Sequence, residues 1–144
     1  MKHRVVLFSL FVLVSCNRTD PPGDIPLNVP KPIGPYSYAT HYEDLIFVSG
    51  QIGIDPVTNT LKEGIEEQTI QVLENLKRVL HNNGSDFDHI AKTTLFLTDI
   101  RQFEMVNKIY STYFSDSFPA RSTIAVVALP RNAKIEIECI AVKK

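Results

Sequence analysis

Apolar side chains recur at helical spacing in two parts of this chain. Residues 65–81 carry apolar positions three and four residues apart, which is the spacing of an amphipathic helix. The residues of this stripe are Ile70, Val72, Leu73, Leu76, Val79 and Leu80, with Lys77 beside them. Asn83 and Gly84 follow directly and are typical of a helix C-terminus. A second helix is predicted over residues 101–114. Its apolar side is made of Phe103, Val106 and Tyr110.

Five shorter segments, rich in β-branched and aromatic residues, are predicted to be strands. They are residues 36–40, 45–52, 90–97, 122–128 and 134–142. Gly50 interrupts the second segment, and a glycine inside a strand marks a bulge or the close approach of another group. The order β-β-α-β-α-β-β predicts an α+β sheet with both helices on one face. The other face would leave many apolar side chains uncovered, so we expect the protein to self-associate.

The last predicted strand alternates between two kinds of side chain. One set points toward the expected helices and should lie in the core: Ile135, Ile137, Cys139 and Ala141. The other set points to the uncovered face, where a partner subunit would bury it: Glu136, Glu138, Ile140 and Val142. Burial and a like charge two residues away would both raise the pKa of the Glu136 carboxyl.

Two charged residues near the end of the chain suggest chemistry on a small carboxylic acid. Arg121 stands at the head of an apolar β-run, and an arginine fork can bind a carboxylate through two hydrogen bonds. Glu136 stands in the next β-run, and a glutamate in a mostly apolar wall is a candidate general base. Together they predict one site at which water acts on a small carboxylic acid. The plainer interpretation is a solvated strand face for Glu136 and a surface ion pair for Arg121.

The beginning of the chain has the pattern of an export signal followed by a spacer. Lys2, His3 and Arg4 precede a ten-residue apolar run, VVLFSLFVLV, which is too short to span a bilayer comfortably. The Leu-Val-Ser-Cys run ending at Cys16 resembles the lipobox of bacterial lipoproteins, which implies removal of residues 1–15 and a lipid on Cys16. An ordinary signal peptide with an incidental cysteine is the alternative. Six of the nine prolines lie between residues 17 and 35, so residues 16–32 are predicted to be an extended tether.

Composition and charge narrow the possible partners. The 144 residues suit one domain, placed at residues 33–144, and 44% hydrophobic with 22% charged residues is ordinary for a soluble globular protein. The net charge is −1 and no basic stripe is present, so we expect no nucleic-acid partner. The sequence has no phosphate-binding loop, dinucleotide fingerprint or zinc-ligand spacing, so no metal and no cofactor are predicted. With Cys16 lipidated, Cys139 has no disulfide partner, and we interpret it as a buried, inert thiol rather than a nucleophile.

Four sequence stretches resemble the Rid family of reactive imine deaminases, which includes the RidA-like enamine/imine deaminases. They are IGPYS at residues 33–37, VSGQI at 48–52, KTTLFLTD at 92–99, and PARS followed by KIEIE at 119–122 and 134–138. The resemblance covers nearly all of the domain that follows the tether. It implies a chorismate-mutase-like fold that assembles as a homotrimer with an inner β-barrel and active sites between subunits.

The same resemblance implies a reaction and a role for several residues. The reaction is hydrolysis of small 2-imino acids to 2-keto acids and ammonia. Arg121 would bind the substrate carboxylate, and Glu136 would orient and activate the attacking water. Other positions would line or support the pocket: Tyr36, Ser49, Gly50, Asn107 and Thr123. Many active relatives carry cysteine at the Thr123 position, which contributes mainly through its backbone.

One feature departs from the family, whose members usually work in the cytosol. An export signal implies a membrane-anchored lipoprotein that faces the periplasm, and Asn17 after Cys16 favours the outer membrane in a Gram-negative host. The resemblance leaves other functions open. The same scaffold could bind a small carboxylate without turning it over, act as a holdase or interaction protein, or carry the ribonuclease activity reported for some relatives.

Overall fold

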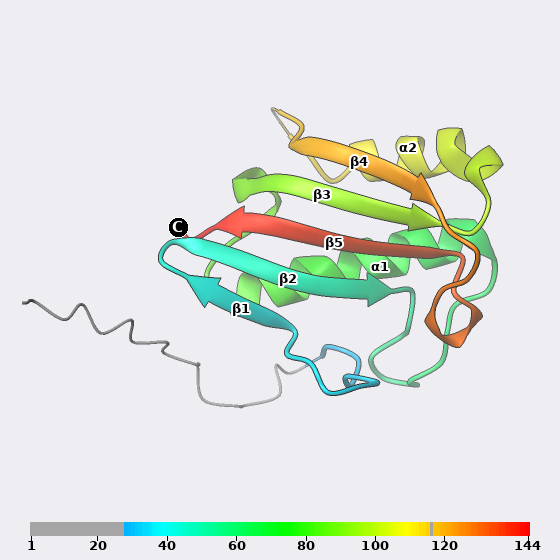
Figure 1. Ribbon diagram of the computed structural model, residues 1–144, viewed down its shortest axis with the longest axis horizontal. Helices are drawn as coiled ribbons and strands as arrows, with labels where there is room; N and C mark the ends of the chain where they lie inside the picture. The colour runs from blue at the N-terminus through cyan, green and yellow to red at the C-terminus, as the bar shows by residue number, and fades with distance from the viewer. Residues whose placement is uncertain (1–27, 116) are drawn as a thin grey trace, which may run out of the picture.

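Five strands form one mixed β-sheet, with the order β1-β2-β5-β3-β4 across it (Figure 1). The computed structural model describes residues 28–115 and 117–144, so the expected leader, lipobox and most of the tether lie outside the described residues. The strands are β1 (Ala39–Tyr42), β2 (Leu45–Ile52), β3 (Ile90–Leu97), β4 (Ala120–Ala125) and β5 (Ile135–Val142). All neighbouring strands are antiparallel except β3 and β4, which are parallel. The predicted strand order along the chain is confirmed.

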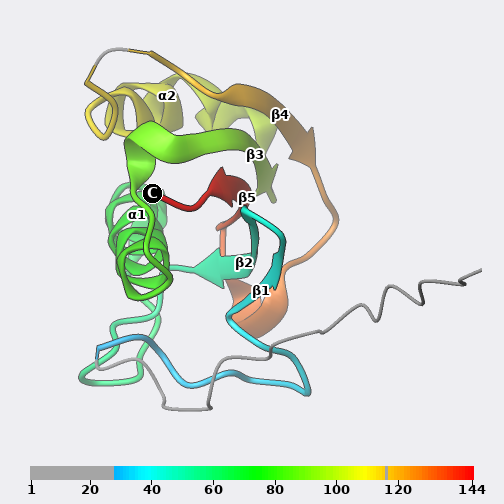
Figure 2. The ribbon, with the colours of Figure 1, turned by 90° about the vertical axis from the view of Figure 1, so that its left-hand side faces the viewer.

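Two helices cover one face of this sheet and leave the other face open, as Figures 1 and 2 show. They are α1 (Gly64–Asn82) and α2 (Phe103–Ser111). Three single 3₁₀ turns complete the described elements: η1 (Phe87–His89), η2 (Ile100–Gln102) and η3 (Pro130–Asn132). The predicted α+β architecture with both helices on one face is therefore confirmed. Within the described residues no helix is both long and apolar enough to cross a membrane.

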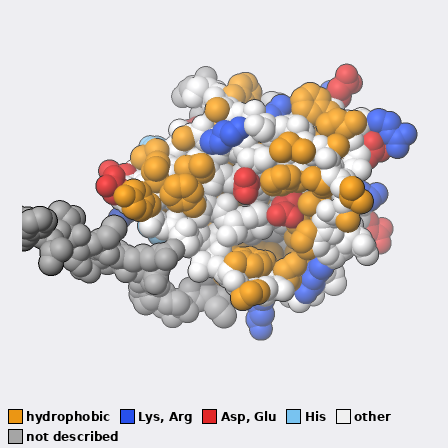
Figure 3. Space-filling view, in the orientation of Figure 1, with side chains coloured by type: hydrophobic (Ala, Val, Ile, Leu, Met, Phe, Trp, Pro, Cys, Tyr) orange, Lys and Arg blue, Asp and Glu red, His pale blue; other side chains and the backbone are white. Residues whose placement is uncertain are grey.

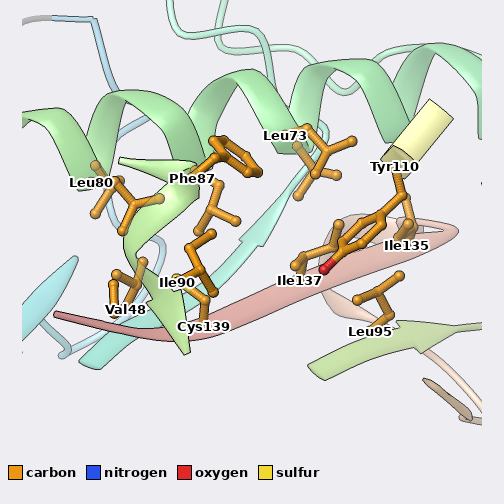
Figure 4. Packing of buried hydrophobic residues seen from close by; sticks show 14 of the residues in the cluster. Val48, Leu73, Leu80, Phe87, Ile90, Leu95, Tyr110, Ile135, Ile137 and Cys139 are labelled. Atoms are coloured by element: carbon orange, nitrogen blue, oxygen red, sulfur yellow. The ribbon is translucent and has the colours of Figure 1, made fainter. Parts of the chain in front are cut away.

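The hydrophobic core lies between the helices and the sheet (Figure 4). The predicted alternation of β5 is confirmed, because all four residues of its apolar set are 2% exposed or less: Ile135, Ile137, Cys139 and Ala141. Burial raises the pKa of the Cys139 thiol to about 12, which agrees with an inert thiol. Val29 also lies in this core, although it falls within the predicted tether of residues 16–32.

The helix α1 ends as its sequence predicted. The N–H groups of Gly84 and Ser85 donate to the carbonyls of His81 and Leu80, and Gly84 has φ of +76°. Only a residue without a Cβ adopts that conformation at little cost, and this makes the Asn83-Gly84 pair an effective helix stop. Ile70 does not belong to the buried stripe, because its side chain is 44% exposed. It lies about one third of a turn away from the buried face.

The boundaries of three predicted elements were wrong by two residues or more. The first strand begins at Ala39 rather than at residue 36, because the chain turns where the Tyr36 N–H donates to the Gly34 carbonyl. The strand β4 ends at Ala125, because its neighbour β3 ends at Leu97 and offers no further partner. The second helix is shorter than residues 101–114. The residues after it, 112–114, donate to carbonyls three positions back and so form a tighter turn.

The open face of the sheet carries large apolar side chains that no other described element covers. Figure 3 shows this face, with hydrophobic side chains across it and a few acidic and basic ones among them. Its most exposed apolar residues on the strands are Tyr42, Leu45, Phe47, Ile124 and Val142, between 37% and 60% exposed. An exposed apolar surface of this kind is typical of an interface between proteins.

Candidate active site

Glu136 lies on the open face of β5, between two apolar side chains. Ile52 of β2 and Phe96 of β3 are its direct neighbours across the two strand pairs. Residues paired in this way project to the same face of the sheet. Glu136 is half-buried, and this burial raises the pKa of its carboxyl, with a further contribution from the charge of Glu138. A carboxyl that holds its proton more tightly than usual is suited to accept one near neutral pH.

A β-bulge in β2 makes room for this carboxylate. The register between β2 and β5 shifts by one residue between Val48 and Gln51, which places Ile52 on the open face. A Cβ atom at Gly50 would overlap a carboxylate oxygen of Glu136 and would lie 2.8 Å from its carboxyl carbon. Only glycine therefore allows the Glu136 side chain to rest on the backbone here. The close approach predicted from this interrupted strand is confirmed.

A pocket of about 230 Å³ surrounds the Glu136 carboxylate. Its other walls are Ile33, Tyr36, Ser49, Gly50, Ile52 and Pro130. The Tyr36 hydroxyl accepts a hydrogen bond from the Ile33 N–H at 3.2 Å, which holds the ring in the loop before β1. The Ser49 hydroxyl donates to the Ser37 carbonyl at 2.7 Å and ties the bulge to the same loop. Of the predicted site residues, the structure brings Tyr36, Ser49 and Gly50 together with Glu136.

Arg121 lies on the opposite face of the sheet, beneath α2. Its guanidinium stands 4.8 Å from the centre of the Tyr110 ring and 5.5 Å from that of Phe103, as in cation–π contacts. Among the described residues it forms no ion pair with a carboxylate. The expected surface ion pair is therefore absent from this part of the chain, and the guanidinium keeps donors for another anion.

A second pocket, of about 460 Å³, opens at this guanidinium. It is lined by Asn107, Tyr110, Ser111, Phe118, Pro119 and Arg121. The side-chain oxygens of Asn107 and Thr123 are buried without a hydrogen-bond partner among the described residues. Thr123 follows Arg121 by two positions in β4 and so projects to the same face. Buried polar atoms normally have partners, so these two oxygens can accept donors from a ligand or a second chain.

Within one chain, the two pockets do not form a single site. Arg121 is paired with Thr93, whose buried hydroxyl contacts that of Tyr110 on the helix side at 2.8 Å. Glu136 is on the open face, two strands away from β4. The distance from β4 to β5 within the sheet is roughly 10 Å, and the thickness of the sheet adds to the separation of the two side chains. Within a single chain Arg121 and Glu136 therefore do not meet, and the shared site between subunits that the resemblance implies stays a prediction.

Sequence reasoning missed most of the pocket walls. Tyr110 and Phe103 were interpreted as the apolar side of the second helix, yet Phe103 is 37% exposed. Their spacing contained the signal, because Phe103, Asn107 and Tyr110 lie four and three residues apart on one helix face. No local pattern marked Phe118, Pro119 or Pro130 as pocket residues.

Within residues 28–115 and 117–144, no group of three acidic, histidine or cysteine side chains could hold a metal ion.

The sequence of this chain is similar to those of known proteins. The family model described as endoribonuclease L-PSP matches residues 27–143. The chain is 46% identical to 2-iminobutanoate/2-iminopropanoate deaminase of Mus musculus over 115 residues, which cover 79% of this chain and 85% of the mouse protein. It is therefore a homologue of that enzyme.

Two solved structures from E. coli share the fold. The crystal structure of the YjgF gene product has a TM-score of 0.77 and 38% identity, covering 81% of this chain and 94% of that one. The crystal structure of TdcF with bound serine has a TM-score of 0.78 and 34% identity, with the same two coverages. The residues matched by the family model, 27–143, include those that line both pockets. On this evidence the chain belongs to the Rid family, also called the YjgF or endoribonuclease L-PSP family.

Proposed function

We propose that this protein hydrolyses small 2-imino acids to 2-keto acids and ammonia. The observation that carries the proposal is a complementary pair of pockets. One has a guanidinium that pairs with no carboxylate of residues 28–115 and 117–144, and the other has a partly desolvated carboxylate. Arg121 offers a fork that matches a substrate carboxylate. Glu136 offers a base with a raised pKa beside an apolar wall. A 2-imino acid needs both groups, one for its carboxylate and one for the water that attacks it.

The two pockets would form one site between two copies of the chain, with the Arg121 pocket of one copy against the Glu136 pocket of the next. The uncovered apolar face supports such an assembly, because a stable interface buries surface of this kind. The buried oxygens of Asn107 and Thr123 support it as well, since neither has a hydrogen-bond partner among the described residues of its own chain. The family resemblance implies three copies around an inner barrel, which would create three equivalent sites.

The chemistry needs little beyond positioning and one proton carrier. The imine carbon is electrophilic, and more so when its nitrogen is protonated. Glu136 would accept a proton from water as the water oxygen bonds to that carbon, which yields a tetrahedral carbinolamine. The same carboxyl would then give its proton to the amino group. The carbon–nitrogen bond breaks and ammonia leaves, while the carbinolamine hydroxyl returns a proton to Glu136 as the carbonyl forms. One water is consumed, and one keto acid and one ammonia are formed.

The names of the relatives agree with this substrate class. The mouse relative is named for 2-iminobutanoate and 2-iminopropanoate. The TdcF structure contains serine, which has a carboxylate and a nitrogen on neighbouring carbons, as a 2-imino acid does.

Other pocket residues would hold the rest of the substrate. Tyr36 and the Ser49-Gly50 backbone would form the wall beside the reacting carbon. Asn107 and Thr123 would form hydrogen bonds with the carboxylate end that Arg121 binds.

A trapping assay tests the proposal on the full chain. An amino-acid oxidase generates 2-imino acids in the presence of semicarbazide, and formation of the semicarbazone is followed over time. The wild-type protein should suppress the semicarbazone. Arg121→Ala should lose about a hundred- to a thousandfold in kcat/KM, the usual effect of removing a charged donor from a reacting ligand. Arg101→Ala is the matched control, since Arg101 is exposed and pairs with Asp99 outside both pockets.

The possible results separate the proposal from its rival. Suppression by the wild type and by Arg101→Ala, but not by Arg121→Ala, supports imine hydrolysis. Equal activity of Arg121→Ala and wild type with 2-iminopropanoate would show that the carboxylate site is misassigned. No suppression with any small imine would leave a protein that binds small carboxylates without turnover.

We also propose that the mature protein is an exported lipoprotein. The basic start, the short apolar run and Cys16 in a lipobox-like context support it. Cells that express the chain and are fed labelled palmitate should label the protein, and Cys16→Ala should abolish the label. Equal labelling of the two would contradict lipidation at this position. Export without any label in the wild type would support an ordinary signal peptide instead.

A further inference from the structure

An exposed loop, residues 31–37, precedes β1 and forms one side of the Glu136 pocket (blue in Figure 1). Two of its residues, Ile33 and Tyr36, line that pocket. A cavity of about 20 Å³, enough for roughly one water molecule, lies between this loop and the bulge of β2. The loop therefore lies close over the part of β2 on which the Glu136 carboxylate rests.

The loop makes few contacts that could fix its own position. Among the described residues, the hydrogen bonds of positions 31–36 run only within the loop. The Ile33 N–H donates to the Tyr36 hydroxyl, and the Tyr36 N–H donates to the Gly34 carbonyl. The placement of these pocket walls therefore depends on how the two ends of the loop are held.

The two ends of the loop are held by different contacts. At the first end, Val29 lies in the hydrophobic core with 5% of its surface exposed, and Pro30, next in the chain, is also buried. At the second end, Ser49 of β2 donates its N–H to the Tyr38 carbonyl and its hydroxyl to the Ser37 carbonyl. The Tyr38 hydroxyl joins the two ends, because it donates to the Pro30 carbonyl at 2.6 Å.

We infer that Tyr38 is a positioning residue that closes this loop and so holds Ile33 and Tyr36 at the Glu136 pocket. The inference rests on the proposed function, because these two residues are walls of the proposed site. The Tyr38 ring packs against the hydrophobic core, so its hydroxyl is held in place on the protein side of the bond. Without this bond, the closed loop would lose a contact that offsets its conformational entropy.

Tyr38 acts on the substrate only through the loop. Its side chain lines the small cavity beneath the loop but is not a wall of the Glu136 pocket. A protein whose binding-competent loop is populated only part of the time binds its substrate more weakly by that fraction. Loss of the Tyr38 hydroxyl should therefore weaken substrate binding and leave the chemical step unchanged.

The test uses the full chain with Tyr38→Phe, which keeps the ring and removes only the hydroxyl. KM for 2-iminopropanoate should rise by about three- to tenfold, the effect of one ordinary hydrogen bond. Because the Glu136 carboxylate still rests on Gly50, kcat should stay within about twofold of wild type. A role in stability alone would lower the melting temperature without this difference between KM and kcat.

Amide hydrogen exchange, followed by mass spectrometry at short labelling times, gives a second readout that needs no turnover. Residues 31–37 should exchange about three- to tenfold faster in Tyr38→Phe, whereas β5 should exchange as in wild type. In the proposed assembly, the Arg121 pocket of the next copy would face this loop. Size-exclusion chromatography of each variant therefore checks that assembly is unchanged.

Tyr113→Phe is the matched control. Tyr113 is also a partly buried tyrosine on the same core, and its hydroxyl donates to Glu74 at 3.0 Å. It lines neither the Glu136 pocket nor the Arg121 pocket. This variant should therefore match wild type in KM and in the exchange of residues 31–37.

The combined results decide the inference. A higher KM with faster exchange confined to the loop in Tyr38→Phe, and neither change in Tyr113→Phe, supports it. Unchanged loop exchange in Tyr38→Phe overturns it, as does faster exchange spread equally over the sheet. Faster loop exchange with an unchanged KM would also overturn it, because the loop would then not position the site. If the wild type hydrolyses no imine, the proposed function fails, and the exchange data still decide whether Tyr38 closes the loop.

Discussion

A single missing side chain determines where the Glu136 carboxylate can lie. Glu136 rests on the backbone of Gly50, where any Cβ would overlap it. A methyl group at this position would force the carboxylate out of its pocket without disturbing the buried face of β5. Catalytic geometry is sensitive to displacements of this kind, since a shift of about 1 Å can cost roughly a hundredfold in rate.

The first prediction concerns this contact. Gly50→Ala should lower kcat of imine hydrolysis by about ten- to a hundredfold, because it displaces the Glu136 carboxylate from the attacking water. Initial rates from the trapping assay measure the effect, and a thermal melt of the same sample checks the fold. Wild-type kcat in a folded Gly50→Ala protein would contradict the proposed role of Glu136.

The raised pKa of Glu136 also affects stability. The folded state binds the Glu136 proton more tightly than the unfolded chain does, because burial and Glu138 disfavour the carboxylate. Protonation of Glu136 therefore contributes to the free energy of unfolding. This contribution is fully present below the unfolded pKa of about 4.3 and is lost as pH rises through the higher folded pKa. At any pH above that folded value, the protein therefore carries the ionised carboxylate at a net cost to stability.

The second prediction follows from that sign. Glu136→Gln should abolish imine hydrolysis and raise the free energy of unfolding at neutral pH, because it removes a partly desolvated charge. The gain should shrink as pH falls from the raised folded pKa toward the unfolded value of about 4.3, and should be absent below it. Denaturant titrations at several pH values and one fixed protein concentration measure it, since assembly makes stability depend on concentration. A neutral-pH stability below that of wild type would argue that Glu136 has a favourable partner in the assembled protein.

At the scale of elements, strand pairing decides which face each functional side chain occupies. The parallel pairing of β4 with β3 places Arg121 and Thr123 on the helix side. The antiparallel pairing of β5 with β2 and β3 places Glu136 on the open side. The helix α1 supports the sheet from behind, and its C-terminal stop at Gly84 lies far from both pockets along the chain.

The third prediction separates this support from catalysis. Gly84→Ala should destabilise the protein by about 1 kcal/mol, because φ of +76° is unfavourable for a residue with a Cβ. Its imine hydrolysis at low temperature should equal that of wild type, since no pocket residue contacts Gly84. The same assay and melt used for Gly50→Ala provide the comparison. A loss of activity without a loss of stability would mean that the α1 terminus affects the site directly.

At the scale of the whole molecule, the two pockets lie on opposite faces of one sheet. They can act on one substrate only if a second copy presents its Glu136 pocket to the Arg121 pocket of the first. The apolar open face offers the surface for that contact, with Tyr42, Phe47 and Ile124 among its exposed side chains. A complete site would then require two chains, each of which contributes half of it.

The fourth prediction tests this shared site. Arg121→Ala and Glu136→Gln should each be inactive alone, and a mixture unfolded and refolded together should regain activity. If trimers assemble at random from equal amounts of the two variants, each site would take its residue 121 from one chain and its residue 136 from the next. About a quarter of the sites would then hold both an intact Arg121 and an intact Glu136. Recovery toward a quarter of wild-type activity supports the shared site. No recovery, with mixed trimers demonstrated by mass spectrometry, would contradict it.

Much of the fold could be predicted from local patterns. The alternation of β5, the buried stripe from Val72 to Leu80 and the Asn83-Gly84 stop all depend on neighbours close in sequence. Boundaries set by distant partners were less predictable. The end of β4 at Ala125 depends on where β3 ends, and the late start of β1 depends on the turn at Gly34.

The sequence by itself determined the family, the element order, the buried face of β5 and the identity of the candidate groups, because motifs and side-chain period are local properties. Only the tertiary structure decided that Arg121 and Glu136 lie on opposite faces, since this follows from the parallel pairing of β4 and the one-residue bulge beside Gly50. It also placed Tyr110 and Phe103 around the guanidinium and Ile52 beside the carboxylate. Contacts between residues far apart in the chain depend on packing, which no local pattern encodes.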